Sequence, residues 1–97
     1  MKSSKLLKKK EVEKALKKLP SWNANPKQTS IATTRTFNNH IDALVFIARI
    51  TVHAQVEDHH PEIVFTYNKV KVTLTTHDVK GLTKKDIDLA LKISALQ

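Results

Sequence analysis

Apolar residues recur at helical spacing in three segments of the chain. The first, residues 8–19, carries lysines opposite its apolar positions, and Pro20 ends it. The second, from Ile41 to about Gln55, is the longest and follows two asparagines that can cap it. The third begins at Thr83. We predict that the buried stripe of the longest helix comprises Ile41, Leu44, Val45, Ala48 and Val52, widened by Phe46 and Ile47.

Three other segments are rich in threonine and β-branched residues, which favour strands. They span residues 28–37, 62–67 and 70–77, and a fourth, short strand is expected within residues 22–26. Together these elements predict one domain over residues 1–97 with an α+β fold. In this fold about three helices cover one face of an antiparallel sheet of three to four strands, which leaves the other face for function.

The last two strands predict a hairpin with a candidate site on its outer face. Asn68 and Lys69 form its two-residue turn. With that turn, His60 lies opposite His77, about 5 Å away between Cβ atoms, and Glu62 lies on the same face. Histidine gives and takes protons near neutral pH, so the pair could serve as acid and base around a small planar substrate. Surface histidines without a function are the alternative interpretation.

Positive charge is concentrated at the N-terminus. The net charge is +8, and eight of the lysines, from Lys2 to Lys18, lie within the first 18 residues. Such a segment can bind nucleic acid. It has no aromatic residue for base stacking, however, and no other part of the chain extends the patch. We therefore interpret the segment as a solvated helix face and do not expect a nucleic-acid partner.

Composition removes several classes of protein. The chain has no cysteine, which excludes thiol nucleophiles and zinc fingers, and Gly81 is its only glycine, which excludes phosphate-cradling loops. No apolar run reaches the roughly 18 residues of a membrane span, and no signal peptide is recognisable, so we expect a cytoplasmic protein. The histidines lack regular metal-ligand spacing, and neighbours on an extended chain point to opposite faces, so we expect no metal.

Four stretches, with the sequences DHHPE, YNKV, TLTTHD and GLTKKD, closely resemble the pterin-4a-carbinolamine dehydratases in residues and in spacing. The resemblance implies removal of water from 4a-hydroxytetrahydropterin, which gives quinonoid dihydropterin, after an aromatic amino-acid hydroxylase has used the pterin. It further implies that no cofactor is needed and that the protein forms a homodimer or homotetramer. One position departs from the motif: Gln55 stands where the family usually has a charged residue or histidine.

The resemblance also implies a set of site residues. The catalytic group is His59, His60 and His77, in which His60 and His77 act as acid and base and His59 binds or orients. The implied substrate-binding residues are Asp58, Pro61, Thr75, Thr76, Asp78 and Asp86. Asp86 also has the spacing of a capping box with Thr83, and this structural interpretation stays open beside the functional one.

A second hypothesis is a non-catalytic module that binds a pterin or another protein, and it is motivated by Gln55. A basic nucleic-acid binder is a weaker version of the same idea.

Overall fold

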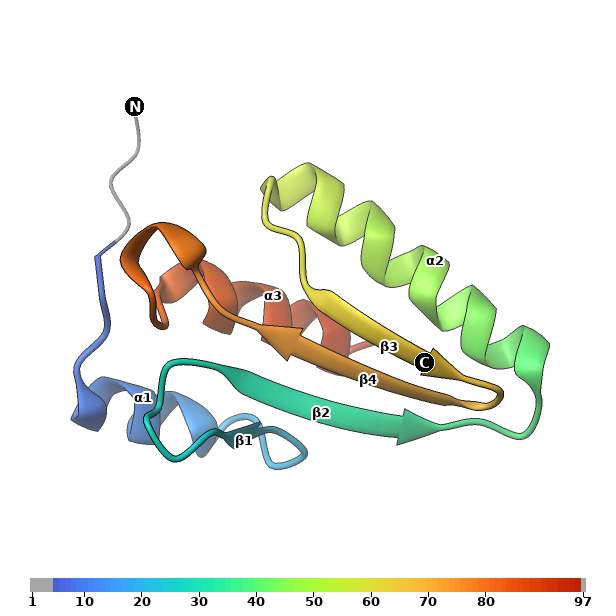
Figure 1. Cartoon of the computed structure of the whole chain (residues 1–97), viewed down its shortest axis with the longest axis horizontal. Helices are drawn as coiled ribbons and strands as arrows, with labels where there is room; N and C mark the ends of the chain where they lie inside the picture. Colours follow the sequence, from blue (N-terminus) through green and yellow to red (C-terminus); the bar gives the residue numbers. More distant parts are fainter. Residues whose placement is uncertain (1–4, 97) are drawn as a thin grey trace.

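The computed structural model describes residues 5–96, so Lys2 of the basic segment lies outside the described residues. Its helices are separated by pairs of strands along the chain (Figure 1). They are α1 (Lys9–Leu16), β1 (Asn23–Ala24), β2 (Ile31–Thr36), α2 (His40–Glu57), β3 (Glu62–Thr66), β4 (Lys69–Leu74), the 3-10 turn η1 (His77–Val79) and α3 (Lys84–Ser94).

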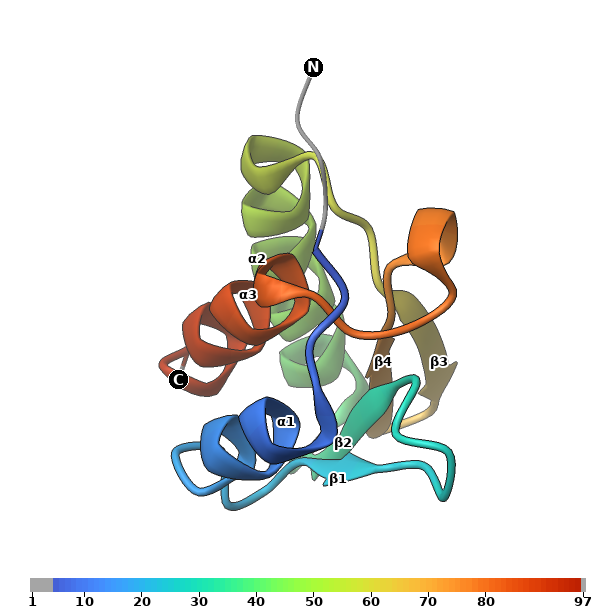
Figure 2. The same cartoon turned by 90° about the vertical axis from the view of Figure 1, so that its left-hand side faces the viewer.

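The strands form one antiparallel sheet in the order β1-β2-β4-β3. Figure 2 shows α1, α2 and α3 on one side of this sheet, while the opposite face has no helix of that size over it. The predicted α+β fold is confirmed, and β1 is the short fourth strand expected after Trp22. Among the described residues, none of the helices has the length and apolar character needed to cross a bilayer.

The core lies between the sheet and the helices. Val70, Val72 and Leu74 alternate along β4 and are fully buried, because alternate strand residues share one face. The helices bury a matching set against them: Val12, Ala43, Phe46, Ile50, Ala54, Leu89, Ala90 and Ile93. Trp22 adds a large aromatic side chain to this core, and its indole N–H donates to Ser94 Oγ at 2.7 Å.

The predicted buried stripe of α2 is wrong. Ile41, Leu44, Val45 and Val52 are between 44% and 63% exposed, and Ala48 is exposed as well. The buried residues are Ala43, Phe46, Ile50 and Ala54, and Ile47 packs partly buried against the core, so the prediction holds only for Phe46 and Ile47. This helix is apolar on two sides, so periodicity alone could not choose between them. Ala43 and Ala54 lie on the buried side, where a small side chain lets the helix approach the sheet closely.

The predicted hairpin turn is also wrong. Tyr67 and Asn68 form the loop, with Tyr67 at φ 45°, and Thr66 pairs with Lys69. Phe65 consequently pairs with Val70 rather than with Val72, a slip of two residues from the predicted register. Because side chains alternate with a period of two, this slip leaves every residue on its predicted face.

Contacts with Phe37 and with the first residue of α2 account for the position of this turn. Phe37 N donates to Asn68 O at 2.8 Å, and Asn68 Nδ2 donates back to Phe37 O at 2.9 Å. His40 Nδ1 donates to Tyr67 O at 2.6 Å and its ring stacks on Phe65 and Tyr67. These contacts are distant in sequence, so turn propensity could not reveal them.

An ion pair between Glu57 and Lys92 joins the end of α2 to α3. The hydrogen bond that Lys92 donates, together with its positive charge, lowers the pKa of the Glu57 carboxyl below its ordinary value, against a smaller opposing effect of burial. The pair therefore stabilises the folded chain where Glu57 is ionised.

The lowered pKa predicts how the stability of the chain responds to acid. The contribution of the pair is complete above the ordinary carboxyl pKa and is lost as the pH falls through the lower pKa of the folded state. Lys92→Met should therefore be less stable than the unmodified chain at neutral pH, with the difference closing as the pH falls below the ordinary pKa of a carboxyl group and through the lower pKa of Glu57 in the folded state. Urea denaturation at several pH values measures this gap. Lys84→Met, which removes an exposed lysine 4.0 Å from Asp88, is the control, and a pH-independent gap for Lys92→Met would contradict the prediction.

Candidate active site

Two cavities adjoin one another where β3 begins and the chain leaves β4. The larger, the histidine cavity, has a volume of about 310 Å³ and is lined by Asp58, His59, His60, Thr75, Thr76, His77, Asp78 and Lys85. The smaller, the strand cavity, has a volume of about 140 Å³ and is lined by His60, Glu62, Thr73, Thr75 and His77. His60, Thr75 and His77 line both cavities.

His60 and His77 share these cavities without being a cross-strand pair. Because β4 ends at Leu74, His77 is the first residue of η1 and not a strand residue, which corrects the predicted direct pairing. The loop that carries His77 is closed by paired backbone hydrogen bonds between Thr76 and Gly81, at 2.8 and 3.3 Å. The loop holds His77 on the same side of the sheet as His60.

The C-terminal end of α2 places His59. Asp58 adopts a left-handed backbone with φ 51°, which ends the helix, and His59 N then donates to Ala54 O at 3.0 Å. This turn directs the His59 ring toward α3, where Nε2 lies 2.5 Å from Asp86 Oδ1. The side chain of His59 is only 10% exposed, so it reaches the histidine cavity from the wall.

Asp86 is fully buried and accepts hydrogen bonds from three directions. Its Oδ2 accepts from Thr76 Oγ1 at 2.7 Å and from Thr83 N at 2.9 Å, while Oδ1 faces His59. A carboxylate can only accept, so His59 Nε2 carries the proton in this contact. Thr76 has spent its hydroxyl proton on Asp86, so Thr83 must donate to Thr76 Oγ1, 2.9 Å away. The capping box of α3 is confirmed, and its carboxylate is also the partner of His59.

Gln55 lies beside His60. The amide oxygen of Gln55 is 3.3 Å from His60 Nε2, and both side chains are exposed. With the oxygen facing the ring, Nε2 is the donor in this contact. Glu57, two residues further along, is held by Lys92 and lines neither cavity.

Most of the predicted site residues meet at the histidine cavity, and two do not. Pro61 and Asp86 line neither cavity: Pro61 leads into β3, and Asp86 lies beneath His59. Two lining residues, Lys85 and Thr73, were not predicted. Their only signal was position, since Lys85 precedes Asp86 and Thr73 shares a face with Thr75. Within residues 5–96, no group of three or more metal-ligating side chains is arranged to hold an ion.

The fold and the site define a class: a small α+β protein with three histidines gathered at one cavity at the end of an open sheet face. The sequence places the chain within that class. The family model for pterin 4 alpha carbinolamine dehydratase matches residues 5–96, so the chain belongs to this family.

Relatives in other organisms agree with this assignment. A protein of Trichormus variabilis is 43% identical over 86 residues, which covers 89% of this chain and 90% of the relative. One of Burkholderia multivorans is 44% identical over 81 residues and covers 84% and 79% of the two chains. Both carry the provisional name pterin-4-alpha-carbinolamine dehydratase.

Two solved structures share the fold. A transcriptional coactivator/pterin dehydratase from Brucella melitensis has a TM-score of 0.90 and 35% identity, covering 94% of this chain and 97% of its own. A pterin dehydratase-like protein identified as a RuBisCO assembly factor in the alpha-carboxysome has a TM-score of 0.66, covering 77% of this chain and 87% of its own. At 18% identity, the second structure shows a likeness of fold alone.

Asp86→Asn tests the buried network. Asparagine has nearly the same shape as aspartate, but its NH2 group replaces one of the two carboxylate oxygens. This donor would then face the groups that donate hydrogen bonds to Asp86. We expect the free energy of unfolding to fall by roughly 2–5 kcal/mol, because buried hydrogen bonds are lost. Asp88→Asn, at a 43% exposed side chain in the same helix, is the matched control. It should change stability by less than about 0.5 kcal/mol in urea denaturation, and equal losses would refute the special position of Asp86.

Proposed function

We propose that this chain catalyses loss of water from a 4a-hydroxytetrahydropterin to give the quinonoid dihydropterin. The observation that carries the proposal is that His60 and His77 both line the two adjoining cavities, while His59 is fixed beside them by a buried carboxylate. Membership of the dehydratase family supports the substrate class.

The reaction needs two proton transfers. A base takes the proton from a ring nitrogen of the pterin, and the electron pair left behind forms a C=N bond to C4a. The C4a–O bond breaks, and an acid protonates the departing hydroxyl so that it leaves as water. No electron is gained or lost overall, so two neutral-pH acid–base groups suffice, and His60 and His77 supply them in either order.

The remaining predicted residues have supporting places in this proposal. His59, fixed by Asp86, orients the substrate from the wall of the histidine cavity, and Asp86 acts through His59 because it is fully buried. Asp58, Thr75, Thr76 and Asp78 line the histidine cavity and would bind the substrate. Pro61 fixes the backbone between His60 and β3, since its ring restricts φ.

The proposal also has consequences for the surroundings of the protein. The substrate would come from an aromatic amino-acid hydroxylase that has used its tetrahydropterin, and the reaction would return the pterin for reduction. A cytoplasmic location agrees with the absence of cysteine.

Self-association is a further part of the proposal. The outer side of α2 exposes a stripe of large apolar residues: Ile41, Leu44, Val45, Val52 and Val56. A stripe of this kind on a small protein marks an interface, and we propose that two copies pack it against each other in a homodimer or homotetramer.

Val52→Lys should disrupt this assembly, because it would bury a charge within the apolar stripe. Light scattering after gel filtration should show a smaller particle than for the unmodified chain. Leu91→Lys, which changes a 40% exposed leucine on α3, is the control and should keep the original size. A monomer for the unmodified chain, or the same shift for both variants, would exclude the α2 stripe as the interface.

His60→Ala and His77→Ala test the chemistry. Each should lower the rate of loss of the 4a-hydroxypterin absorbance by about 100-fold or more, because a general acid or base is removed. His53→Ala is the matched control, since His53 lies on α2 and lines neither cavity. Circular dichroism checks that each variant is folded.

The same assay separates the two candidate functions. If the unmodified chain binds a dihydropterin but does not speed dehydration, the chain is a non-catalytic pterin-binding module, as the neutral Gln55 beside His60 would favour. If it is active and the two histidine variants keep full activity, the assigned roles are wrong.

A further inference from the structure

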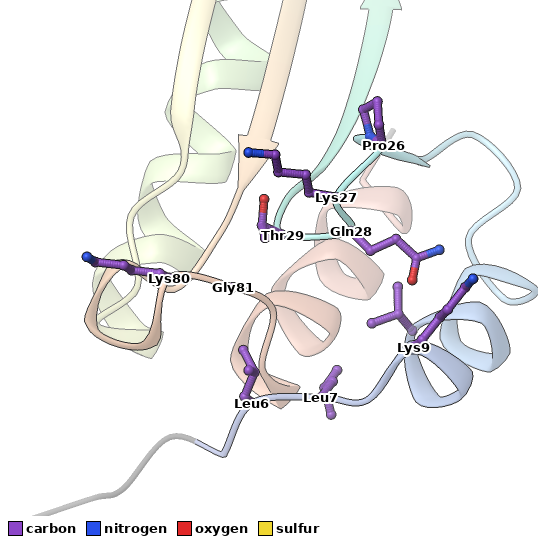
Figure 3. Close-up of a pocket in the computed structure, with 10 residues that line it drawn as sticks. Leu6, Leu7, Lys9, Pro26, Lys27, Gln28, Thr29, Lys80 and Gly81 are labelled. Atoms are coloured by element: carbon purple, nitrogen blue, oxygen red, sulfur yellow. The ribbon is translucent and has the colours of Figure 1, made fainter.

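A second cavity of similar size lies away from the histidines. This lysine pocket has a volume of about 320 Å³ and is formed by three segments: the N-terminal segment with α1, the loop before β2, and the end of the η1 loop. Figure 3 shows Lys9, Lys27 and Lys80 around its edge, one on each of these segments, with their side chains leading outward in different directions and with Gln28 and Thr29 between them. Leu6 and Val12 supply part of an apolar wall.

The charge of this pocket has a single sign. All of its ionisable lining residues are lysines, whereas the histidine cavity also contains Asp58 and Asp78. Within residues 5–96, Lys9, Lys27 and Lys80 have no ion pair and no side-chain hydrogen bond. An ammonium group can only donate hydrogen bonds. The lining therefore offers positive charge and donors with no counter-charge from the described part of the chain.

Gln28 is unusual in two respects. It has a left-handed backbone with φ 54°, which is uncommon for a residue other than glycine. Its Oε1 is also the one buried side-chain oxygen or nitrogen in the described range without a hydrogen-bond partner. Native proteins rarely leave such an atom unpaired, and both departures fall at the lining of this pocket.

The loop itself does not need the Gln28 side chain. Asn25 closes it, because Asn25 Oδ1 accepts from Thr29 N at 2.7 Å and from Ser30 N at 3.0 Å. Asn25 Nδ2 also donates to Thr29 Oγ1 at 2.8 Å, which leaves the Thr29 hydroxyl proton available. The amide of Gln28 is therefore free to turn toward a ligand, with Thr29 as a neighbouring donor.

We propose that the lysine pocket binds a small organic anion. Its carboxylate or phosphate group would be held by the exposed side chains of Lys9, Lys27 and Lys80, which would turn inward from the rim on binding, and its apolar part would pack on Leu6 and Val12. The Gln28 amide turns on binding and gains the partner that it lacks. This site is separate from the proposed dehydratase site, and its occupancy does not depend on that activity.

The test uses benzoate and phenyl phosphate as anionic probes and phenol as the neutral control. In titrations followed by ¹H–¹⁵N NMR, the anions should produce saturable shifts at the backbone amides of residues 27–29 and 80–81. Phenol should bind at least about tenfold more weakly, because it lacks the charge that the lysines pair with. Added salt should weaken anion binding.

Variants make the assignment specific. Lys27→Met and Lys80→Met should each weaken the binding of phenyl phosphate by about two- to fivefold, and the double variant by about tenfold. Lys14→Met, also an exposed lysine of α1 but outside the pocket, should leave binding within about twofold. Gln28→Gly suits the left-handed backbone, so it should stay folded while binding weakens.

Three results would overturn the proposal. They are shifts that do not saturate, shifts confined to the amides of the histidine cavity, and equal effects of Lys14→Met and the pocket variants.

Discussion

The site depends on the hydrogen bonds that the buried carboxylate of Asp86 accepts. It has no contact with solvent, so its charge must be compensated by donors, and three converge on it: the His59 ring, the Thr76 hydroxyl and the Thr83 backbone N–H. These donors come from the end of α2, the segment after β4 and the start of α3. One group therefore begins a helix, holds the strand exit beside it and fixes a histidine at the cavity wall. The same set of bonds accounts for the cap of α3 and for the position of the His59 ring.

Much of this arrangement could be predicted from the sequence, and the errors have physical causes. Periodicity located the helices and the strands, but α2 is apolar on two sides, and only packing against the sheet selects Ala43 and Phe46 over Leu44 and Val45. Turn propensity placed the hairpin one residue late, because contacts from Phe37 and His40 determine the loop. The observed register differs from the predicted one by two residues, so His60 and His77 still lie on the same side of the sheet. The expected strand pairing could not show that β4 ends at Leu74, before His77.

Family membership and site geometry answer different questions. The family model and the relatives define what kind of molecule this is, and the geometry indicates which atoms could move a proton. The structure shared with the RuBisCO assembly factor shows that the fold itself is compatible with more than one use. In this chain the neutral Gln55 lies beside His60 and offers a hydrogen bond without a charge. The proposed proton transfer would therefore proceed without a carboxylate at that position.

Thr75 lies between the histidine cavity and the lysine pocket. It lines the histidine cavity, and its hydroxyl donates to Thr29 O at 2.6 Å and lies 3.4 Å from Gly81 O. Thr29 and Gly81 belong to the lysine pocket, so a single side chain forms part of the partition between two binding volumes. By thermodynamic linkage, any coupling across this side chain is mutual. If a ligand in one cavity raises the affinity of the other cavity for its own ligand by some factor, the second ligand raises the affinity for the first by the same factor. Ligand binding in the two neighbouring cavities would then be coupled through Thr75.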